Sequence, residues 1–314
     1  MPTPTAIRND TATDDLGDLL ASWRRHMTAQ RMSPATLSTY STSVGQLASF
    51  LAAQGMPTSP GAMTREHVEA FISDLLAKWK PATAHNRYRA LASFFRWLVD
   101  EGEVRDSPMA RMKPPRLPEV PPAVLRAEEL RRLLEVCERD KTFAGRRDEA
   151  ILRVFMDTGV RRGEVLGLTL DDIDLDRGVL SVMGKGSRTR EVGIGAQTVR
   201  AVDRYLRARS KHPAAASPAL WLSRKGVLRE SGLAELVRDR GRQAGVAGRL
   251  HPHLFRHAYA HSMLAAGMQE TDLMAIAGWR SRDMVARYAA STRQERAVAS
   301  ARALSPVDRM ANDR

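Results

Sequence analysis

The sequence has little cysteine, little lysine and no long apolar run. One cysteine, Cys137, among 314 residues excludes an intramolecular disulfide and a cysteine-rich zinc site. It follows apolar residues in a stretch typical of a helix, where we expect it to be buried as a small hydrophobic side chain. No N-terminal apolar segment or uncharged apolar run is present, which argues against secretion and membrane spanning. We therefore expect a cytoplasmic protein with no membrane partner.

Acidic residues are scarce relative to basic ones. The formal net charge is +13 and the sequence pI is about 10.6. Residues 1–120 carry 14 basic and 12 acidic residues, and residues 121–314 carry the remaining 35 and 24. Because neutralisation of phosphates by Lys and Arg dominates nucleic-acid binding, the excess indicates a nucleic-acid partner, contacted mainly by the C-terminal part. A basic protein whose charge serves only solubility is the alternative.

Four amphipathic segments predict a small helical bundle in the first third of the chain. Residues 1–13 are polar and contain two prolines, so we expect a disordered tail there. Helices are expected to begin at Leu16, Ser33, Thr64 and Pro81. Four short helices with short connections fold as an independent domain, which we assign to residues 14–106.

A proline-rich stretch separates this bundle from the rest of the chain. Six of the 16 prolines fall within residues 107–122, interleaved with basic residues. This composition predicts a semi-rigid, extended, basic linker over residues 107–124. In residues 125–290, helical periodicity is interrupted by two strand candidates, 178–184 and 189–195, whose short connection predicts a β-hairpin. The expected fold class is mainly α, with a four-helix domain and a mixed α/β domain that holds a small antiparallel sheet.

Three polar clusters hold side chains suited to breaking a phosphodiester. Two of them contain Arg161 and Arg256, whose planar guanidinium forks bind phosphate oxygens and keep their charge. The third ends at Tyr288, a phenolic nucleophile that needs nearby cations and a base because its ordinary pKa is about 10. Taken singly, each cluster has a simpler explanation: a surface Arg–Glu ion pair, a structural His-x-x-Arg, or an aromatic on an amphipathic helix.

In this order, the clusters resemble those of the tyrosine recombinases, also called phage integrases. The matching stretches are Thr-Gly-Val-Arg-Arg-Gly-Glu at 158–164, His-Leu-Phe-Arg-His at 253–257, and the run from Gly-Trp at 278–279 to Tyr288. The resemblance implies that Tyr288 attacks a DNA phosphate, forms a 3′-phosphotyrosine and releases a 5′-hydroxyl, without cofactor or metal. It also implies a core-binding, SAM-like N-terminal domain and a catalytic domain over 125–290.

The same resemblance implies roles for the remaining cluster residues. Arg161, Arg256, His253 and Trp279 would act with Tyr288 at the scissile phosphate, and Glu164 and His257 would support them. Lys185, in a Gly-Lys-Gly turn that is otherwise simply polar, would protonate the leaving 5′-oxygen. Trp279 stands where many members have histidine and others tryptophan; its indole N–H still donates a hydrogen bond, although a core tryptophan is the alternative.

Basic residues outside the clusters are candidates for DNA contacts. They lie in the N-terminal domain, the linker and the hairpin: Lys80, Arg87, Arg89, Arg111, Lys113 and Arg188. The acidic run Asp171, Asp172 and Asp174 falls at a helix-to-strand turn, where capping is expected, so we predict no metal site.

The resemblance extends to partners. It implies a homotetramer on double-stranded DNA attachment sites, in which a C-terminal helix within residues 291–314 docks on a neighbouring protomer; packing on its own domain would use the same apolar stripe. A directionality factor would be an accessory partner. The compact length favours an integrase of a phage or mobile element. A Xer-type chromosome-dimer-resolving recombinase, a type IB topoisomerase and a non-catalytic DNA-binding regulator are the alternatives.

Overall fold

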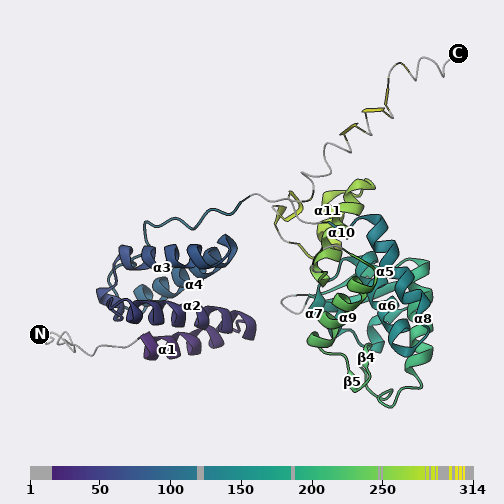
Figure 1. The fold of residues 1–314 in the computed structure, drawn as a ribbon, viewed down its shortest axis with the longest axis horizontal. Coiled ribbons are helices and arrows are strands. Elements are labelled where there is room, and N and C mark those ends of the chain that lie inside the picture. Colours follow the sequence, from purple (N-terminus) through teal and green to yellow (C-terminus); the bar gives the residue numbers. More distant parts are fainter. Residues whose placement is uncertain are drawn as a thin grey trace, which may run out of the picture. The chain divides into compact units, whose positions relative to one another are not determined.

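The computed structural model describes most of the chain as two compact units, 1–119 and 120–314. The described residues are 16–118, 124–184, 188–246, 248, 250–279, 281–282, 284–286, 288, 297–298, 301–302, 304–305 and 307. The predicted tail over 1–13, Lys185 and most of the predicted C-terminal helix lie outside them. Both units are drawn in Figure 1, and each has a hydrophobic core of its own.

The N-terminal unit is built from four helices packed around one core (Figure 1). They are α1 (Leu16–Ala29), α2 (Pro34–Ala53), α3 (Arg65–Lys78) and α4 (Pro81–Asp100), with a short 3-10 turn, Pro60–Ala62. Helix α2 begins as its sequence predicts, because the Ser33 side chain accepts a hydrogen bond from the Thr36 N–H and Pro34 occupies the first turn. Apolar faces at helical spacing bury Trp23 against Phe94 and Trp97, which fixes the bundle.

The first part of the proline-rich segment packs against this bundle. Met109 is buried in the N-terminal core. The Tyr88 hydroxyl of α4 donates to the Met112 carbonyl at 2.7 Å, and the His85 ring lies 3.0 Å from the Pro115 carbonyl. This part of the proline-rich segment therefore packs on α4 and belongs to the N-terminal unit. The division between the two compact units falls after residue 119.

The C-terminal unit packs helices around a long central helix, α6 (Phe143–Thr158). Its other helices are α5 (Ala127–Arg139), α7 (Arg162–Gly167), α8 (Ala196–Arg209), α9 (Glu230–Gln243), α10 (Pro252–Ala265) and α11 (Glu270–Ala277), with a 3-10 turn, Leu170–Asp172. Buried residues of α6 include Ile151, Leu152 and Phe155, and the Phe155 ring stacks on Phe255 of α10. Helix α6 ends at Gly159, whose φ of 56° is left-handed and whose Cβ, if present, would lie 2.5 Å from Tyr259.

The predicted hairpin is confirmed as β2 (Val179–Met183) and β3 (Thr189–Gly193), paired antiparallel. A two-residue strand, β1 (Ile173–Asp174), joins the other edge of β2 and makes a three-stranded sheet. A second small hairpin, β4 (Leu222–Ser223) with β5 (Gly226–Val227), was not predicted, because strands of two residues leave no alternating pattern. The expected fold class, mainly helical with small antiparallel sheets, is confirmed.

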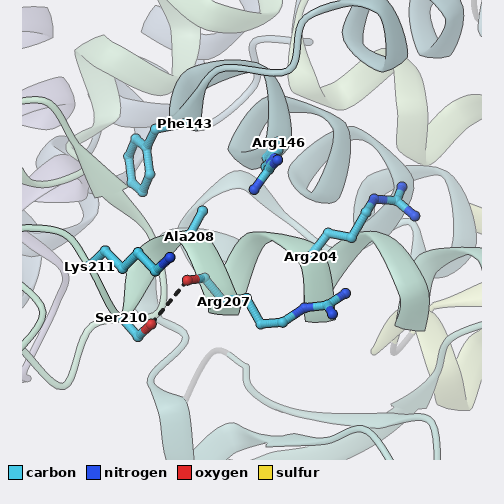
Figure 2. A pocket seen from close by; sticks show the side chains of 7 residues that line it. All are labelled: Phe143, Arg146, Arg204, Arg207, Ala208, Ser210 and Lys211. Carbon is cyan, nitrogen blue, oxygen red and sulfur yellow. Dashed lines mark hydrogen bonds between the residues drawn. The ribbon is translucent and has the colours of Figure 1, made fainter.

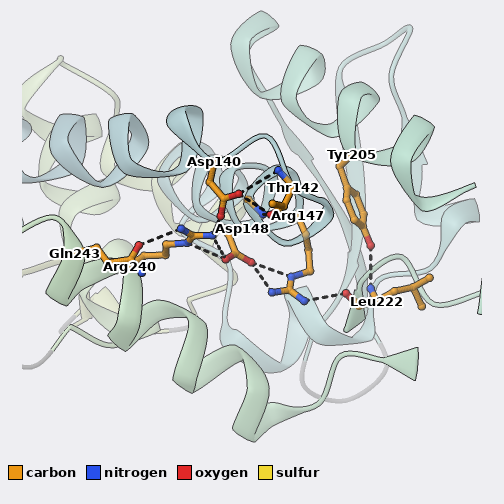
Figure 3. Close-up of polar contacts among 9 residues, drawn as sticks. Asp140, Thr142, Arg147, Asp148, Tyr205, Leu222, Arg240 and Gln243 are labelled. Carbon is orange, nitrogen blue, oxygen red and sulfur yellow. Dashed lines mark hydrogen bonds and ion pairs between the residues drawn. The ribbon is translucent and has the colours of Figure 1, made fainter. Parts of the chain in front are cut away.

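A buried ionic network ties α9 to the start of α6, as Figure 3 shows. The Arg240 guanidinium of α9 donates to Asp148 at 2.9 Å and to Asp140 at 2.6 Å. Asp148 also accepts from Arg147, which donates in turn to the Leu222 carbonyl at 3.2 Å. Burial raises the pKa of Asp148 despite these two arginines. Because every member is hydrogen-bonded, the network joins α6, α9 and β4 into one frame.

Among the described residues, no helix combines the length and the apolar character that crossing a membrane requires.

Candidate active site

Three arginine side chains from different elements meet at the C-terminal end of α11. Arg190 of β3, Arg256 of α10 and Arg161 at the N-cap of α7 donate to the carbonyl oxygens of residues 276, 277 and 278, at 2.6, 2.7 and 3.3 Å respectively. The last carbonyls of a helix lack intrahelical partners and carry the negative end of its macrodipole. This helix end therefore offsets the repulsion among three clustered cations.

Gly278 ends α11 beside these arginines. Its φ of 64° is left-handed, a conformation that glycine adopts without steric cost. A Cβ built on it would already touch the Arg190 guanidinium, at 3.4 Å. The glycine thus turns the chain out of the helix close to the cations and leads directly to Trp279.

Glu164 joins two of the three arginines. One of its carboxylate oxygens accepts from Arg161 Nη1 at 2.8 Å and the other from the Arg161 backbone N–H at 2.8 Å. Arg190 binds both oxygens, at 3.0 and 2.8 Å. Burial alone raises the pKa of Glu164, but the hydrogen bonds from Arg190 and Arg161 outweigh it and leave that pKa below its usual value. The Arg161–Glu164 pair is thus part of a buried cluster and not a surface ion pair.

Arg190 is the site residue that the sequence motifs did not reveal. It lies on β3 two positions before the buried Val192, so the alternation of the strand turns both side chains to the same inner face. An arginine at an inward-facing position of a predicted strand was the sequence signal that could have identified Arg190 as a site residue. Its partners could not be inferred, because Glu164 and residue 276 lie 26 and 86 positions away in the chain.

Arg256, Trp279 and Tyr288 form a stack. The Trp279 and Tyr288 rings are parallel within 2°, with centroids 5.3 Å apart, and the Arg256 guanidinium lies 4.9 Å from the Trp279 ring centroid. Arg256 is 2% exposed, and its Nη1 also donates to the Gly159 carbonyl at 2.8 Å. Burial, followed by the neighbouring charge of Arg161, lowers the pKa of Arg256 to about 10, so it remains a cation at neutral pH.

The nucleophile candidate is buried beside a histidine. Tyr288 is 2% exposed, and its hydroxyl is hydrogen-bonded to Nδ1 of His257. The His257 ring is in turn edge-on to His253, one turn earlier on α10, with centroids 4.7 Å apart. Burial and the charges of Arg256, His251 and Arg161 lower the pKa of His253, so its imidazole is neutral at pH 7.

A cleft of about 400 Å³ opens next to these side chains. It is lined by the start of α7 and the start of α10, including Arg161, His251 and His253. The N-terminal end of α10 and the partly exposed guanidinium of Arg161 border this space, and both favour a negatively charged ligand there.

Lys185 and the candidate DNA contacts are the remaining residues that the sequence singles out. Lys185 is not among the described residues, but the chain that leads to it passes the site: a Cβ on Gly184 would lie 3.4 Å from Arg190 and 3.9 Å from Glu164. Arg87 is half-buried and donates to Ser43 of α2 at 3.3 Å. The other five candidate DNA contacts are exposed: Lys80, Arg89, Arg111, Lys113 and Arg188.

A second basic hollow, of about 680 Å³, lies on α6 and α8 and contains none of the predicted site residues (Figure 2). Its cations are Arg146, Arg204, Arg207 and Lys211. Arg204 pairs with Glu149 and Arg207 with Asp203, whereas Arg146 and Lys211 have no ion pair with any described residue. These side chains offer matched controls for charge changes in the site.

The acidic run near β1 caps turns, as predicted. Asp172 accepts from the Thr169 N–H at 2.8 Å, and Asp174 accepts from the Arg177 N–H at 2.9 Å. Within the described part of the chain, no group of three or more His, Cys, Asp or Glu side chains is placed to hold a metal ion.

The Glu164 cluster predicts a pH-dependent stability. In Glu164→Gln we expect the free energy of unfolding at neutral pH to fall by about 1.5–3 kcal/mol, the range for hydrogen bonds to charged groups. Because the folded-state pKa of Glu164 is depressed, its contribution is fully present above the ordinary value of 4.5 and is lost as the pH falls through the lower folded value. Urea unfolding of both proteins at neutral and acid pH measures this difference.

Two outcomes test that prediction. Glu191→Gln, which removes an exposed carboxylate of β3 that pairs with Arg177, is the control and should change stability by under about 1 kcal/mol. A Glu164→Gln deficit that persists undiminished at acid pH would contradict the assigned role of the carboxylate charge.

The chain matches known protein families and curated relatives over most of its length. The model of the phage integrase family matches residues 123–295, and that of the phage integrase N-terminal SAM-like domain matches residues 19–102. The tyrosine recombinase XerC of Myxococcus xanthus is 30% identical over 280 residues, covering 87% of this chain and 93% of XerC. XerD of Bifidobacterium longum is 31% identical over 273 residues, covering 82% and 87%.

Solved structures share the fold. The XerH site-specific recombinase bound to palindromic difH substrate has a TM-score of 0.74 at 19% identity, covering 90% of this chain and 83% of XerH. The Tn1549 transposon integrase in complex with circular intermediate DNA has a TM-score of 0.67 at 18% identity, covering 87% and 94%.

These matches define the class of protein, enzymes that cleave and rejoin DNA through a tyrosine intermediate. The chain belongs to the phage integrase family, the tyrosine recombinases, which cleave and rejoin DNA.

Proposed function

We propose that this chain is a site-specific DNA recombinase whose nucleophile is Tyr288. The observation that carries the proposal is the Arg256–Trp279–Tyr288 stack at the end of α11, beside the cleft that Arg161 lines. Arg256, which packs on Trp279 in this stack, and Arg161 at the cleft would provide the phosphate ligands and the positive field that a tyrosine nucleophile needs.

The reaction follows from these groups. Arg161 and Arg256 bind non-bridging oxygens of a DNA phosphate, and His253 at the cleft adds a further donor. Tyr288 gives its phenolic proton to a neighbouring base as Oη attacks phosphorus, the bond to the 5′-oxygen breaks, and Lys185 supplies the proton that this oxygen takes. A 5′-hydroxyl from a partner strand then attacks the phosphotyrosine and restores a phosphodiester. Energy is kept in the covalent bond, so no nucleotide is hydrolysed.

The exposed basic residues supply the contacts with the duplex outside the reacting phosphate. Lys80 lies at the N-terminus of α4, where backbone N–H groups also favour a phosphate. We assign Lys80, Arg89 and the linker cations Arg111 and Lys113 to phosphate contacts, and Arg188 to the same task beside the hairpin turn. Arg87 would first have to leave Ser43.

Recombination joins two duplexes, so we propose that four copies assemble on two attachment sites in the cytoplasm. The C-terminal segment within 291–314 would link neighbouring copies, and a directionality factor would choose between integration and excision. We assign the enzyme to a phage or other mobile element on the presence of Trp279.

A Xer-type resolving recombinase is the second candidate. It is favoured by the relatives named XerC and XerD, which match this chain over 82–87% of its length. The two candidates differ in where the target lies: at the ends of an element that carries this gene, or at a separate chromosomal locus.

Unbiased capture of the substrate tests the proposal. Purified protein is mixed with a library of duplexes that are nicked near a randomised sequence, so that cleavage releases a short strand and traps the adduct. We expect covalent adducts that converge on one sequence, which we call the captured duplex, and none from Tyr288→Phe. Equal adduct yields from Tyr288→Phe and wild type would overturn the nucleophile assignment. Locating the captured sequence in the source genome separates the two candidates.

A further inference from the structure

His257, one position after Arg256, is hydrogen-bonded to the proposed nucleophile. Its Nδ1 is bonded to the Tyr288 hydroxyl, and the two ring centroids are 5.3 Å apart. The contact joins α10 to Tyr288, 31 residues later in the chain. A contact between an imidazole nitrogen and a phenolic oxygen is the geometry that direct proton transfer requires.

The surroundings hold the phenol in this orientation. Trp279 covers one face of the Tyr288 ring in a parallel stack, and Arg256 lies over Trp279 in turn. This stack and the hydrogen bond to His257 together orient the Tyr288 hydroxyl. The His257 ring contacts the His253 ring, and His253 lines the cleft that Arg161 borders.

His257 is in its neutral form at neutral pH. Burial, followed by the charges of His253, His251 and Arg256, lowers the pKa of His257 to about 4. Among the described residues that follow α11, the titratable group in ring contact with His257 is the Tyr288 phenol. In the tautomer that carries its proton on Nε2, the Nδ1 lone pair is free to accept the phenolic O–H.

Two other groups of the cluster are poor candidates for the base. Both oxygens of Glu164 accept from Arg161 and Arg190, and its depressed pKa makes it a poor proton acceptor. Trp279 has no basic nitrogen, because its indole donates only. His257, one position after Arg256, therefore supplies the basic nitrogen that the indole of Trp279 lacks.

We infer that His257 is the general base of strand cleavage, an inference that rests on the proposed function. As Tyr288 Oη bonds to phosphorus, the Oη–H bond breaks and a bond from Nδ1 to that proton forms. The bond from phosphorus to the 5′-oxygen breaks, and this oxygen takes its proton from Lys185. In rejoining, the His257 imidazolium returns its proton to the phenolate that leaves phosphorus.

DNA binding strengthens this base at the moment of reaction. A neutral imidazole surrounded by cations is a weak base, since those cations oppose the imidazolium. A phosphate bound between Arg161 and Arg256 brings a negative charge, and the pentacoordinate phosphorus brings a second. Negative charge favours the protonated form of His257, so its pKa rises toward neutrality only when substrate is present.

Single-turnover cleavage of the captured duplex tests the inference in His257→Asn. Asparagine can still accept a hydrogen bond from the phenol but cannot hold a proton at neutral pH. We expect cleavage to slow by about 10²–10⁴-fold, the range for general acid–base catalysis. The wild-type rate should also fall on the acid side as His257 becomes protonated, and this fall should be missing in the variant.

An acidified phenol separates proton transfer from positioning. Difluorotyrosine at position 288 loses its proton more readily, so it should relieve the His257→Asn deficit by at least about 10-fold. His253→Asn, one turn away on α10, is the matched control, and its deficit should not be relieved. His257→Gln provides a second variant if His257→Asn does not fold.

The outcomes distinguish the inference from the proposed function. No adduct from wild type would remove both. Wild-type adduct formation with a His257→Asn protein that is equally fast, or faster, would overturn the role of His257 alone. So would a deficit that is constant with pH and untouched by difluorotyrosine.

Discussion

Replacing Arg256 with lysine is expected to abolish most strand cleavage while leaving DNA binding nearly intact. The guanidinium donates to two backbone carbonyls, of Gly159 and Ala277, from different nitrogens of one plane. An ammonium group cannot span both carbonyls and also present donors to a phosphate. Loss of one donor to developing transition-state charge costs about 10²–10³-fold in rate.

The same substitution should reduce stability. One of the two buried carbonyls would lose its partner, at a cost of about 1–3 kcal/mol. Arg207→Lys is the matched control, because Arg207 is an exposed arginine on α8 outside the site. Adduct formation on the captured duplex and filter binding measure cleavage and DNA binding, and urea unfolding measures stability. An Arg256→Lys protein that cleaves within about threefold of wild type, given the 10²–10³-fold expected, would show that this arginine is structural only.

Replacing Trp279 with alanine is expected to have the second large effect, on stability and on cleavage together. The indole is 7% exposed, stacks on the Tyr288 ring and lies with its centroid 4.9 Å from the Arg256 guanidinium. Truncation of a buried large aromatic to alanine costs about 3–5 kcal/mol, because a cavity remains. The phenol would also lose the surface that orients its hydroxyl, so adduct formation should fall even where the protein is folded.

Trp279→Phe resolves the two contributions. A phenyl ring preserves a flat surface against Tyr288 but removes the indole nitrogen, which is buried and has no hydrogen-bond partner among the described residues. We expect this variant to keep most of its stability. If it also cleaves at the wild-type rate, the tryptophan supports the tyrosine; if cleavage is lost while the fold is kept, the indole N–H acts on the phosphate. Thermal unfolding alongside adduct formation provides the comparison.

Local chemistry explains why the helices were predictable. Ser33 before Pro34 and Gly159 after Thr158 fix a helix start and a helix end through neighbouring residues alone. The hairpin was also predictable, because glycines bound two short runs that hold β-branched residues such as Val179. In the same way, the motif residues Arg161, Arg256 and Tyr288 could be named because each stands in a recognisable local setting.

The geometry that joins them was not predictable from local patterns. Arg161 reaches the carbonyl of residue 278 across 117 positions, and Arg190 reaches that of residue 276 across 86. Such contacts depend on how α11 ends against β3 and α10, which no short window encodes. His257 shows the same limit: the sequence places it beside Arg256, but only the fold brings it to the hydroxyl of Tyr288.

Peptide mapping of the covalent adduct tests the central claim most directly. Wild-type protein is trapped on the captured duplex, digested with protease and nuclease, and analysed by mass spectrometry. We expect a nucleotide mass on the peptide that contains Tyr288, attached through a 3′-phosphate. A nucleotide on any other side chain would contradict the account. So would the absence of any adduct when the protein binds the captured duplex and the strand opposite the nick is intact.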